Sequence, residues 1–217
     1  MEKFESITGI AIPLFVSNIN TDTLMPSEWG RDHPNELGPG LLRHWRYGPD
    51  GKETPGFVFN DPRFREAMIL VAGINFGCGS SRETAVWGLV GYGIRVVIAP
   101  SFGEIFCDNA FQNGLLVIDL PLETVESLCV YLAKSGDPTM TVDLVRRVVE
   151  YGGQSHAFVI ADDRREALLE GLDDTALLQR YETDTTQFQA QDRKARPWVY
   201  LTKHTVAPYG SPLQGTL

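Results

Sequence analysis

The sequence predicts an α/β fold with a parallel βαβ core, and three observations support this prediction. Residues 68–72 form a short apolar run with the length and composition of a buried strand, and residues 95–99 form a second such run. Between them, apolar residues recur at helical intervals over 85–90, and Gly91 and Gly93 then end the pattern. Two parallel strands need a crossover helix of this kind, so the loop after the first strand should lie at the carboxyl edge of the sheet.

The loop of the βαβ unit, residues 75–83 and called the glycine loop below, reads Asn-Phe-Gly-Cys-Gly-Ser-Ser-Arg-Glu. Ser80 and Glu83 have the spacing of a capping box, which predicts that the helix begins at Ser80. A helix that begins after Gly77 and Gly79 would point free backbone N–H groups at the space above it, and its dipole would add partial positive charge there. The sequence therefore predicts an anion-binding loop.

Three chemistries suit this loop. Phosphate binding is weakened because the loop lacks the P-loop lysine and the third glycine of the dinucleotide fingerprint. Cys78 is a candidate nucleophile beside a helix N-terminus, although a small buried cysteine is the commoner case. In the third, Arg82 grips a substrate carboxylate and Ser80 or Ser81 transfers a proton. Arg82 could instead pair with Glu83 or another surface acid, and both serines could simply cap the helix.

Composition limits the classes of function. The chain has 217 residues and a formal net charge of -9, which argues against a nucleic-acid partner. The N-terminus lacks a signal pattern and no apolar stretch approaches the roughly 20 residues that span a bilayer, so we expect a cytoplasmic protein without a membrane partner. Cys78, Cys107 and Cys129 lack CxxC spacing, which favours reduced thiols over disulfides or a self-contained zinc or iron–sulfur site.

The chain before the βαβ unit has three segments. Residues 9–16 contain Pro13 and are predicted to form an edge strand. Residues 17–26 form a polar loop around Asp22, which could simply close a turn. Residues 27–61 are too long for an ordinary connection and rich in aromatic residues, which is typical of a lid or recognition loop or of a packed surface excursion.

After the βαβ unit, the pattern predicts alternating helices and strands, with Cys129 on the buried face of one helix. A second capping-box spacing places the start of the next helix at Ser101. Residues 183–217 carry three prolines and scattered charge, so we expect a folded domain over 1–182 and an extended tail over 183–217. The expected elements are a helix over 101–111, a strand over 115–120, a helix over 123–134, a hairpin of two strands within 140–160, and helices over 163–170 and 174–181.

These motifs resemble those of a known family. The chain is similar to the small subunit of 3-isopropylmalate dehydratase, which corresponds to the swivel domain of the aconitase superfamily. The resemblance covers roughly residues 4–182 in the right order. The motifs that carry it are residues 75–83, Tyr92-Gly-x-Arg-Val-Val-Ile-Ala-Pro-Ser-Phe-Gly-Glu-Ile-Phe106, Asn109-x-Phe-x-Asn-Gly-Leu115, residues 18–26 and residues 170–174.

The resemblance implies a three-layer β/β/α swivel domain over residues 1–182 and a partner, a separate large subunit that carries a [4Fe-4S] cluster. No cofactor would be bound by this chain itself. The implied enzyme is a hydro-lyase of leucine biosynthesis that isomerises 2-isopropylmalate to 3-isopropylmalate through isopropylmaleate, as a heterodimer or heterotetramer. Its substrate is a small dicarboxylate, and the cluster's open iron would act as a Lewis acid on the leaving hydroxyl.

By motif matching, the resemblance also implies site residues. Ser80 takes the place of the superfamily's catalytic serine base. Gly79, Ser81 and Arg82 would bind the substrate, the last two at its carboxylate. Asp22 matches an active-site aspartate that we expect to orient a histidine of the large subunit.

Two departures from the family leave alternatives open. Thr84 stands where the family usually has histidine, and the segment after Pro26 does not match the common leucine-pathway form well. Within that segment, Arg31 could bind a carboxylate or pair with Asp32 or Glu28. The alternatives are an enzyme for another substituted malate, such as methylmalate (related to citraconate) or dimethylmalate, and a swivel-fold binding subunit without catalysis.

Overall fold

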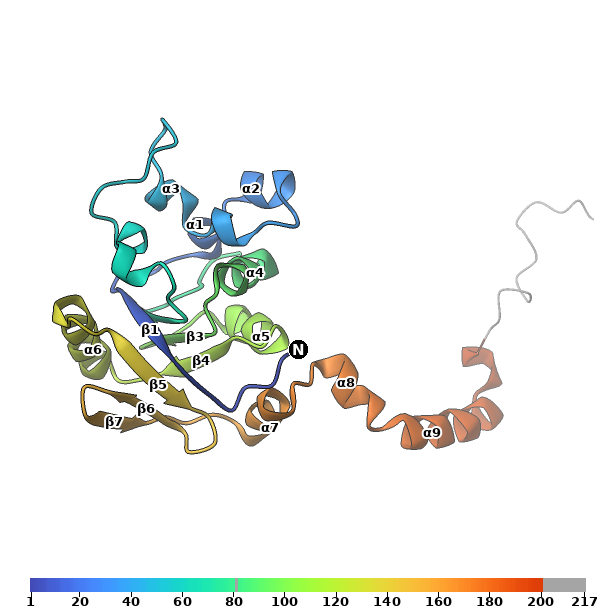
Figure 1. Ribbon diagram of the computed structural model, residues 1–217. Coiled ribbons are helices and arrows are strands. Elements are labelled where there is room, and N and C mark those ends of the chain that lie inside the picture. Colours follow the sequence, from blue (N-terminus) through green and yellow to red (C-terminus); the bar gives the residue numbers. More distant parts are fainter. Residues whose placement is uncertain (81, 201–217) are drawn as a thin grey trace, which may run out of the picture. The chain divides into compact units, whose positions relative to one another are not determined.

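The computed structural model describes residues 1–80 and 82–200 of the 217-residue chain. In this part of the chain, the strands form one mixed sheet in the order β4-β3-β2-β1-β5-β6-β7 (Figure 1). β1 to β4 run parallel, whereas β1 pairs with β5, and β5 to β7 with one another, in antiparallel fashion. The bounds are Ser6–Leu14 (β1), Ile69–Ala72 (β2), Val96–Ala99 (β3), Leu116–Asp119 (β4), Thr139–Asp143 (β5), Val148–Tyr151 (β6) and Gln154–Ala157 (β7).

The predicted βαβ unit is confirmed: β2, helix α4 (Glu83–Tyr92) and β3 follow one another, and β2 pairs with β3 in parallel. Gly93 ends α4 in the left-handed conformation, at φ +113°. The predicted start at Ser80 was wrong. Arg82 is the N-cap residue, its backbone is extended, and no side chain caps the helix. Ser80 therefore lies in the loop, free of the capping role.

Helix α5 (Glu104–Gln112) also begins later than its capping-box spacing predicted. Gly103 is the N-cap residue, and the Ser101 hydroxyl instead accepts a hydrogen bond from the backbone N–H of Asn75 at 2.9 Å. The Ser101 hydroxyl therefore joins two loops and does not cap α5. The end of α5 at Asn113 and Gly114 agrees with the prediction.

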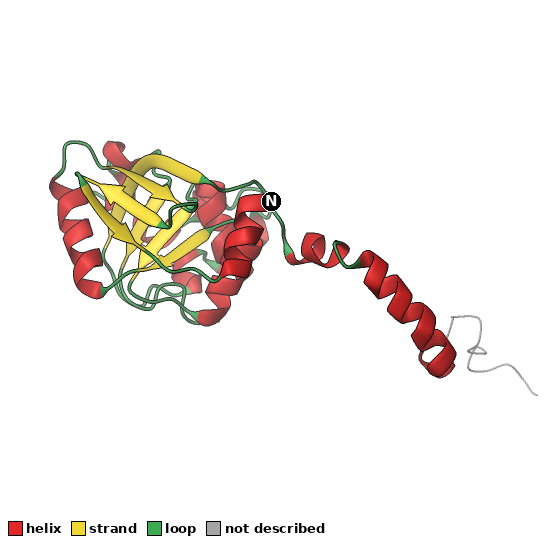
Figure 2. Ribbon diagram, turned by 90° about the horizontal axis from the view of Figure 1, so that it is seen from below, coloured by secondary structure: helices red, strands yellow, loops and turns green. Residues whose placement is uncertain are grey.

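Two hydrophobic cores lie on opposite faces of the parallel strands, because successive side chains of a strand point to opposite faces. On one face, Leu70 and Val97 pack with α4 and α5. On the other, Val71 and Ile98 pack with helix α6 (Leu122–Lys134), strands β5 and β6, and helix α7 (Asp162–Glu170). The antiparallel strands, the parallel strands and the α4–α5 layer thus form the expected β/β/α arrangement. Figure 2 shows helices on both sides of the strands.

Strand β1 is central, so its prediction as an edge strand was wrong. Its first half, Ser6 to Ile10, pairs with β5, and its second half, Ala11 to Leu14, pairs with β2. Pro13 lies in the second half, beyond the pairing with β5. Its missing N–H therefore costs no bond on that side, which explains how proline is accommodated in a central strand.

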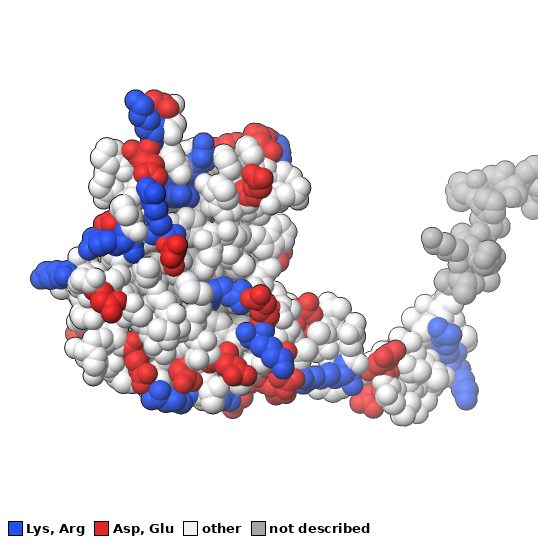
Figure 3. All heavy atoms as spheres, in the orientation of Figure 1, with Lys and Arg blue, Asp and Glu red and all other residues white. Residues whose placement is uncertain are grey.

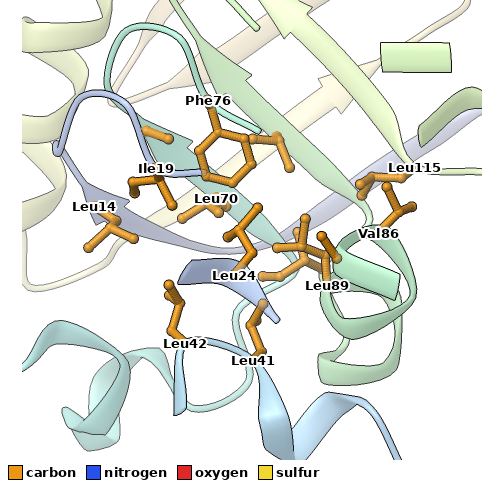
Figure 4. Packing of buried hydrophobic residues seen from close by; sticks show 14 of the residues in the cluster. Leu14, Ile19, Leu24, Leu41, Leu42, Leu70, Phe76, Val86, Leu89 and Leu115 are labelled. Atoms are coloured by element: carbon orange, nitrogen blue, oxygen red, sulfur yellow. The ribbon is translucent and has the colours of Figure 1, made fainter. Parts of the chain in front are cut away.

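The long segment after residue 26 is a packed excursion of short helices on the α4 side of the sheet. Leu41 and Leu42 are fully buried, and Figure 4 shows both beneath Leu24 of helix α1, which lies centrally among the labelled core residues. This segment therefore forms part of the core. Its helices, with α1, are α1 (Thr21–Leu24), α2 (Ser27–Asp32), η1 (Gly38–Gly40), α3 (Arg43–Arg46), η2 (Val58–Asn60) and η3 (Pro62–Phe64).

The chain divides into two compact units, Met1–Asp174 and Thr175–Leu217. Helix α8 (Asp174–Gln179) agrees with the expected helix over 174–181, and it is followed by α9 (Glu182–Ala195) and η4 (Pro197–Val199). Most of α9 falls where an extended tail was expected. No glycine or proline interrupts residues 182–196, and Arg196 pairs with Asp192 at 2.6 Å. Residues 201–217 of the expected tail lie outside the described part of the chain.

Aromatic packing lies beneath the turn that follows β2. Gly77 has φ +72°, and a Cβ atom there would lie 2.3 Å from a ring carbon of Phe106. That ring meets Phe76 edge-on, with centroids 5.4 Å apart, and stacks with Phe102. Both the backbone conformation and the close ring exclude any side chain at this position.

We predict that Gly77→Ala destabilises the protein by about 2–4 kcal/mol, because strain at positive φ and overpacking against Phe106 add. Gly56→Ala is the matched control: Gly56 has φ +75° and open space around its Cβ position. It carries the strain alone, about 1 kcal/mol. Chemical denaturation measures both variants, and equal losses would show that the ring contact is unimportant.

Candidate functional site

Three loops meet at the carboxyl edge of the parallel strands. They follow β1, β2 and β3, and backbone hydrogen bonds join them directly. The N–H of Gly77 donates to the carbonyl of Ile19 at 2.8 Å, and the N–H of Thr21 donates to the carbonyl of Cys78 at 2.9 Å. The N–H of Phe76 donates to the carbonyl of Ser101 at 3.0 Å. The loops therefore continue the order of the sheet beyond the ends of its strands, as the predicted position of the glycine loop required.

Two asparagines hold the first two loops together. Asn18 and Asn75 both have φ +58°, a left-handed conformation that asparagine tolerates better than most residues. The Asn75 side-chain amide donates to Asn18 Oδ1 at 2.8 Å. The two loops thus turn in the same unusual way and are fixed to each other at that point.

Asp22 and Arg82 bring the first two loops together on the exposed side. Asn20 caps α1 by accepting a hydrogen bond from the N–H of Thr23 at 2.7 Å, which places Asp22 in the first turn. Asp22 Oδ1 lies 3.2 Å from a guanidinium nitrogen of Arg82. The surface acid that pairs with Arg82 is therefore the predicted active-site aspartate. The side chains are 53% and 42% exposed, so both keep surface for another molecule.

Ser80 is exposed in the second loop, and its hydroxyl lies 3.4 Å from that of Thr21. Gly79 precedes it at φ +95°, where a Cβ atom would lie 3.2 Å from Asn20 Cβ. Gly79, Ser80, Asp22 and Arg82 are thus brought together by contacts between the same two loops. Ser81, the other predicted ligand in this loop, lies outside the described residues.

The Asn113 side chain is hydrogen-bonded to the first turns of α4, a role that the sequence analysis missed. The Asn113 amide donates to Glu83 Oε1 at 2.9 Å and to the carbonyl of Asn109 at 2.8 Å, and it accepts from the Trp87 indole N–H at 2.9 Å. Because Glu83 directly follows Arg82, these bonds fix the backbone from which Arg82 extends. The expected motif around Asn109 contained Asn113, but no local pattern indicated the contacts that Asn113 makes.

A depression of about 340 Å³ lies beside Asp22. Within it, His44 Nε2 lies 2.9 Å from Glu28 Oε1. A backbone hydrogen bond and the contact with His44 hold the pKa of Glu28 below its usual value. Arg31 is absent from the lining and pairs with Asp32 at 3.2 Å, one of the two acids that the sequence analysis considered. The lining residues are Asn20, Asp22, Thr23, Pro26, Ser27, Glu28, His44 and Trp45.

The cysteines differ in their surroundings. Burial raises the pKa of Cys107 to about 11 and that of Cys129 to about 12, so both thiols stay protonated near neutral pH. Cys129 lies in the core, as predicted. Cys78 lies in the glycine loop, but the helix it was expected to adjoin begins only at Glu83. The N-terminus beside this residue is instead that of α5: a Cβ atom on Gly103, the N-cap residue of α5, would lie 3.2 Å from Cys78 Cα.

Charges on the surface are mixed. On the face shown in Figure 3, acidic and basic side chains are interspersed. Ion pairs elsewhere in the described residues include Arg63–Asp61 (2.7 Å) and Arg164–Asp108 (2.7 Å). Within residues 1–80 and 82–200, no three His, Cys, Asp or Glu side chains gather closely enough to hold a metal ion. None of the helices in this part of the chain has the length and apolar character needed to cross a membrane.

Comparison with known proteins identifies the family. The model of the aconitase C-terminal domain family matches residues 1–123. The 3-isopropylmalate dehydratase small subunits of Paracoccus denitrificans and Paramagnetospirillum magneticum are 45% and 44% identical to this chain, over 92% of it and 100% of their own length. The crystal structure of a 3-isopropylmalate dehydratase from Methanocaldococcus jannaschii is similar, with 26% identity, a TM-score of 0.61, and coverage of 84% of this chain and 99% of that one. The chain therefore belongs to the family of 3-isopropylmalate dehydratase small subunits within the aconitase superfamily.

Proposed function

We propose that this chain is the small subunit of a heteromeric hydro-lyase that isomerises 2-isopropylmalate to 3-isopropylmalate in leucine biosynthesis. The reaction removes water to give isopropylmaleate and adds it back at the neighbouring carbon. The observation that carries the proposal is that, in a chain of this family, Ser80 contacts Thr21 and Arg82 contacts Asp22, both on helix α1. Elimination requires a base for a carbon-bound proton, a grip on the carboxylates and an acid for the leaving hydroxyl.

Ser80 is the proposed base. A serine hydroxyl is a weak base unless its surroundings stabilise the alkoxide. Ser80 is exposed at the carboxyl edge, does not cap α4, and has the Thr21 hydroxyl within 3.4 Å. Its oxygen is therefore available to substrate, and polar neighbours from the adjoining loop can stabilise its charged form.

Arg82 is the proposed ligand of a substrate carboxylate, together with Ser81 and Gly79. A guanidinium has five N–H donors in a planar fork, and one of its nitrogens lies 3.2 Å from Asp22 Oδ1. The side chain is 42% exposed, and a fork of this geometry suits a bidentate grip on a carboxylate. Asp22 is proposed to orient a histidine of the large subunit, and its half-exposed carboxylate is accessible to a partner chain. A substrate role for Arg31 would require its release from Asp32.

The partner in this proposal is a large subunit that carries a [4Fe-4S] cluster, in a heterodimer or heterotetramer located in the cytoplasm. The name of the relatives, small subunit, implies a heteromeric complex. The cluster when bound supplies a Lewis-acidic iron for the leaving hydroxyl. The thiols of Cys107 and Cys129, with their raised pKa values, are poor iron ligands, which is consistent with a cluster held by the partner.

Another substituted malate is the second candidate substrate. The depression beside Asp22 is lined by Trp45 and Pro26 but also by the polar pair of Glu28 and His44. An isopropyl group would gain little from that pair, so a malate with a smaller side group, such as methylmalate or dimethylmalate, remains a competing proposal. Thr84 on α4, in place of the usual histidine, motivates the alternative of a binding subunit without catalysis.

Anaerobic reconstitution with the cognate large subunit tests the proposal. We expect isopropylmaleate to form from 2-isopropylmalate only when both chains are present, with higher kcat/KM than for methylmalate or dimethylmalate. Each chain alone serves as the control. Faster turnover of a smaller malate would replace the substrate, and a cluster-loaded complex inactive on all three would contradict the hydro-lyase proposal.

Ser80→Ala is predicted to lower kcat of this complex by about 100-fold or more without preventing assembly, because general-base catalysis contributes on that scale. Ser127→Ala is the control, since Ser127 lies on the exposed side of α6 and donates to the carbonyl of Glu123 in the same helix at 2.8 Å. Cys78→Ser should retain most activity. Full activity in Ser80→Ala would contradict the role of the serine as base. Loss of activity in Cys78→Ser would favour the thiol as the catalytic group.

A further inference from the structure

Thr21 is a buried polar residue beside the proposed base. Its side chain has no exposed surface, although it directly precedes the half-exposed Asp22. A buried hydroxyl needs a hydrogen-bonding partner, because burial without one costs free energy. The Ser80 hydroxyl, at 3.4 Å, supplies it.

The backbone of Thr21 is held on both sides. Its N–H donates to the carbonyl of Cys78 at 2.9 Å, and its carbonyl accepts from the N–H of Met25 at 2.9 Å. The Asn20 side chain caps the same short helix. Thr21 is therefore a rigid residue of the first loop whose hydroxyl is aimed at the second loop.

We propose that Thr21 is a positioning residue that orients the Ser80 hydroxyl and donates a hydrogen bond to it when Ser80 acts as a base. The inference rests on the proposed function, since it specifies how the serine becomes basic. The present 3.4 Å separation is long for two hydroxyls, and such contacts tighten when one partner carries charge or substrate is bound. A donor to the charged form lowers the pKa of the group that accepts it.

Thr21 and Asp22 are successive residues of α1 that make different contacts. The first reaches Ser80 and the second reaches Arg82, so one turn of helix sets both functional side chains of the glycine loop. Their side chains leave the helix in different directions, which explains why one is buried and the other exposed.

Thr21→Val and Thr21→Ser in the reconstituted complex test the proposal. Valine keeps the shape and removes the hydroxyl, so kcat for 2-isopropylmalate should fall about tenfold or more with KM within about twofold. The rising limb of the pH profile of kcat should move to higher pH, because the alkoxide loses its donor. Serine keeps the hydroxyl and should restore kcat and the wild-type profile.

Several outcomes decide the matter. Wild-type kcat and pH profile in Thr21→Val would overturn the positioning role, as would a serine variant as defective as the valine variant, since shape would then matter instead of the hydroxyl. Thermal unfolding of each complex shows whether a loss is one of stability. No turnover by the wild-type complex, or full turnover by Ser80→Ala, would instead overturn the proposed function on which the inference rests.

Discussion

The structure depends on the alignment of three parallel strand ends. β1, β2 and β3 stop at the same edge, and their loops then keep pairing through main-chain hydrogen bonds such as those from Gly77 to Ile19 and from Thr21 to Cys78. These bonds satisfy backbone groups that would otherwise be unpaired near the sheet. They also fix side chains far apart in the sequence to one small surface, since Asp22 and Arg82 belong to different loops.

Aromatic packing under the glycine loop and hydrogen bonds at the start of α4 make this edge of the sheet rigid. The rings of Phe76, Phe102 and Phe106 fill the space under the glycine loop, and Gly77 fits only because it lacks a side chain. Asn113 holds the start of α4 through Glu83. A catalytic group held by packed elements is positioned more accurately than one on a free loop, so a short sequence on this edge can serve demanding chemistry.

Much of the fold could be predicted because the periodicity of the sequence reports burial directly. The βαβ unit and the inner face of α6 with Cys129 follow from apolar spacing. The hairpin between β6 and β7 follows from Gly152 and Gly153, both at positive φ, although three strands and not two occupy this region. The predicted capping boxes failed because tertiary contacts used the same groups: the hydroxyl of Ser101 binds Asn75 of another loop.

The other differences also have tertiary causes. The argument from Pro13 to an edge strand did not allow for a strand whose two halves pair with different neighbours. Of the candidate site residues, motif matching proposed Asp22, Gly79, Ser80 and Arg82, which the fold brings together. Arg31 was considered as a carboxylate ligand in a segment that departs from the family's motif, and it pairs with Asp32. Thr21 was missed because nothing in the local sequence distinguishes a threonine that reaches another loop from one that fills space.

The central claim is that the two loops act as one site, and a double-mutant cycle tests it most directly. The cycle compares kcat/KM of the reconstituted complex for wild type, Asp22→Asn, Arg82→Gln and the double variant. Side chains in contact and acting together should be non-additive, so the double variant should lose at least about fivefold less than the product of the single losses. Losses that simply multiply would show that Asp22 and Arg82 act independently and would contradict the account.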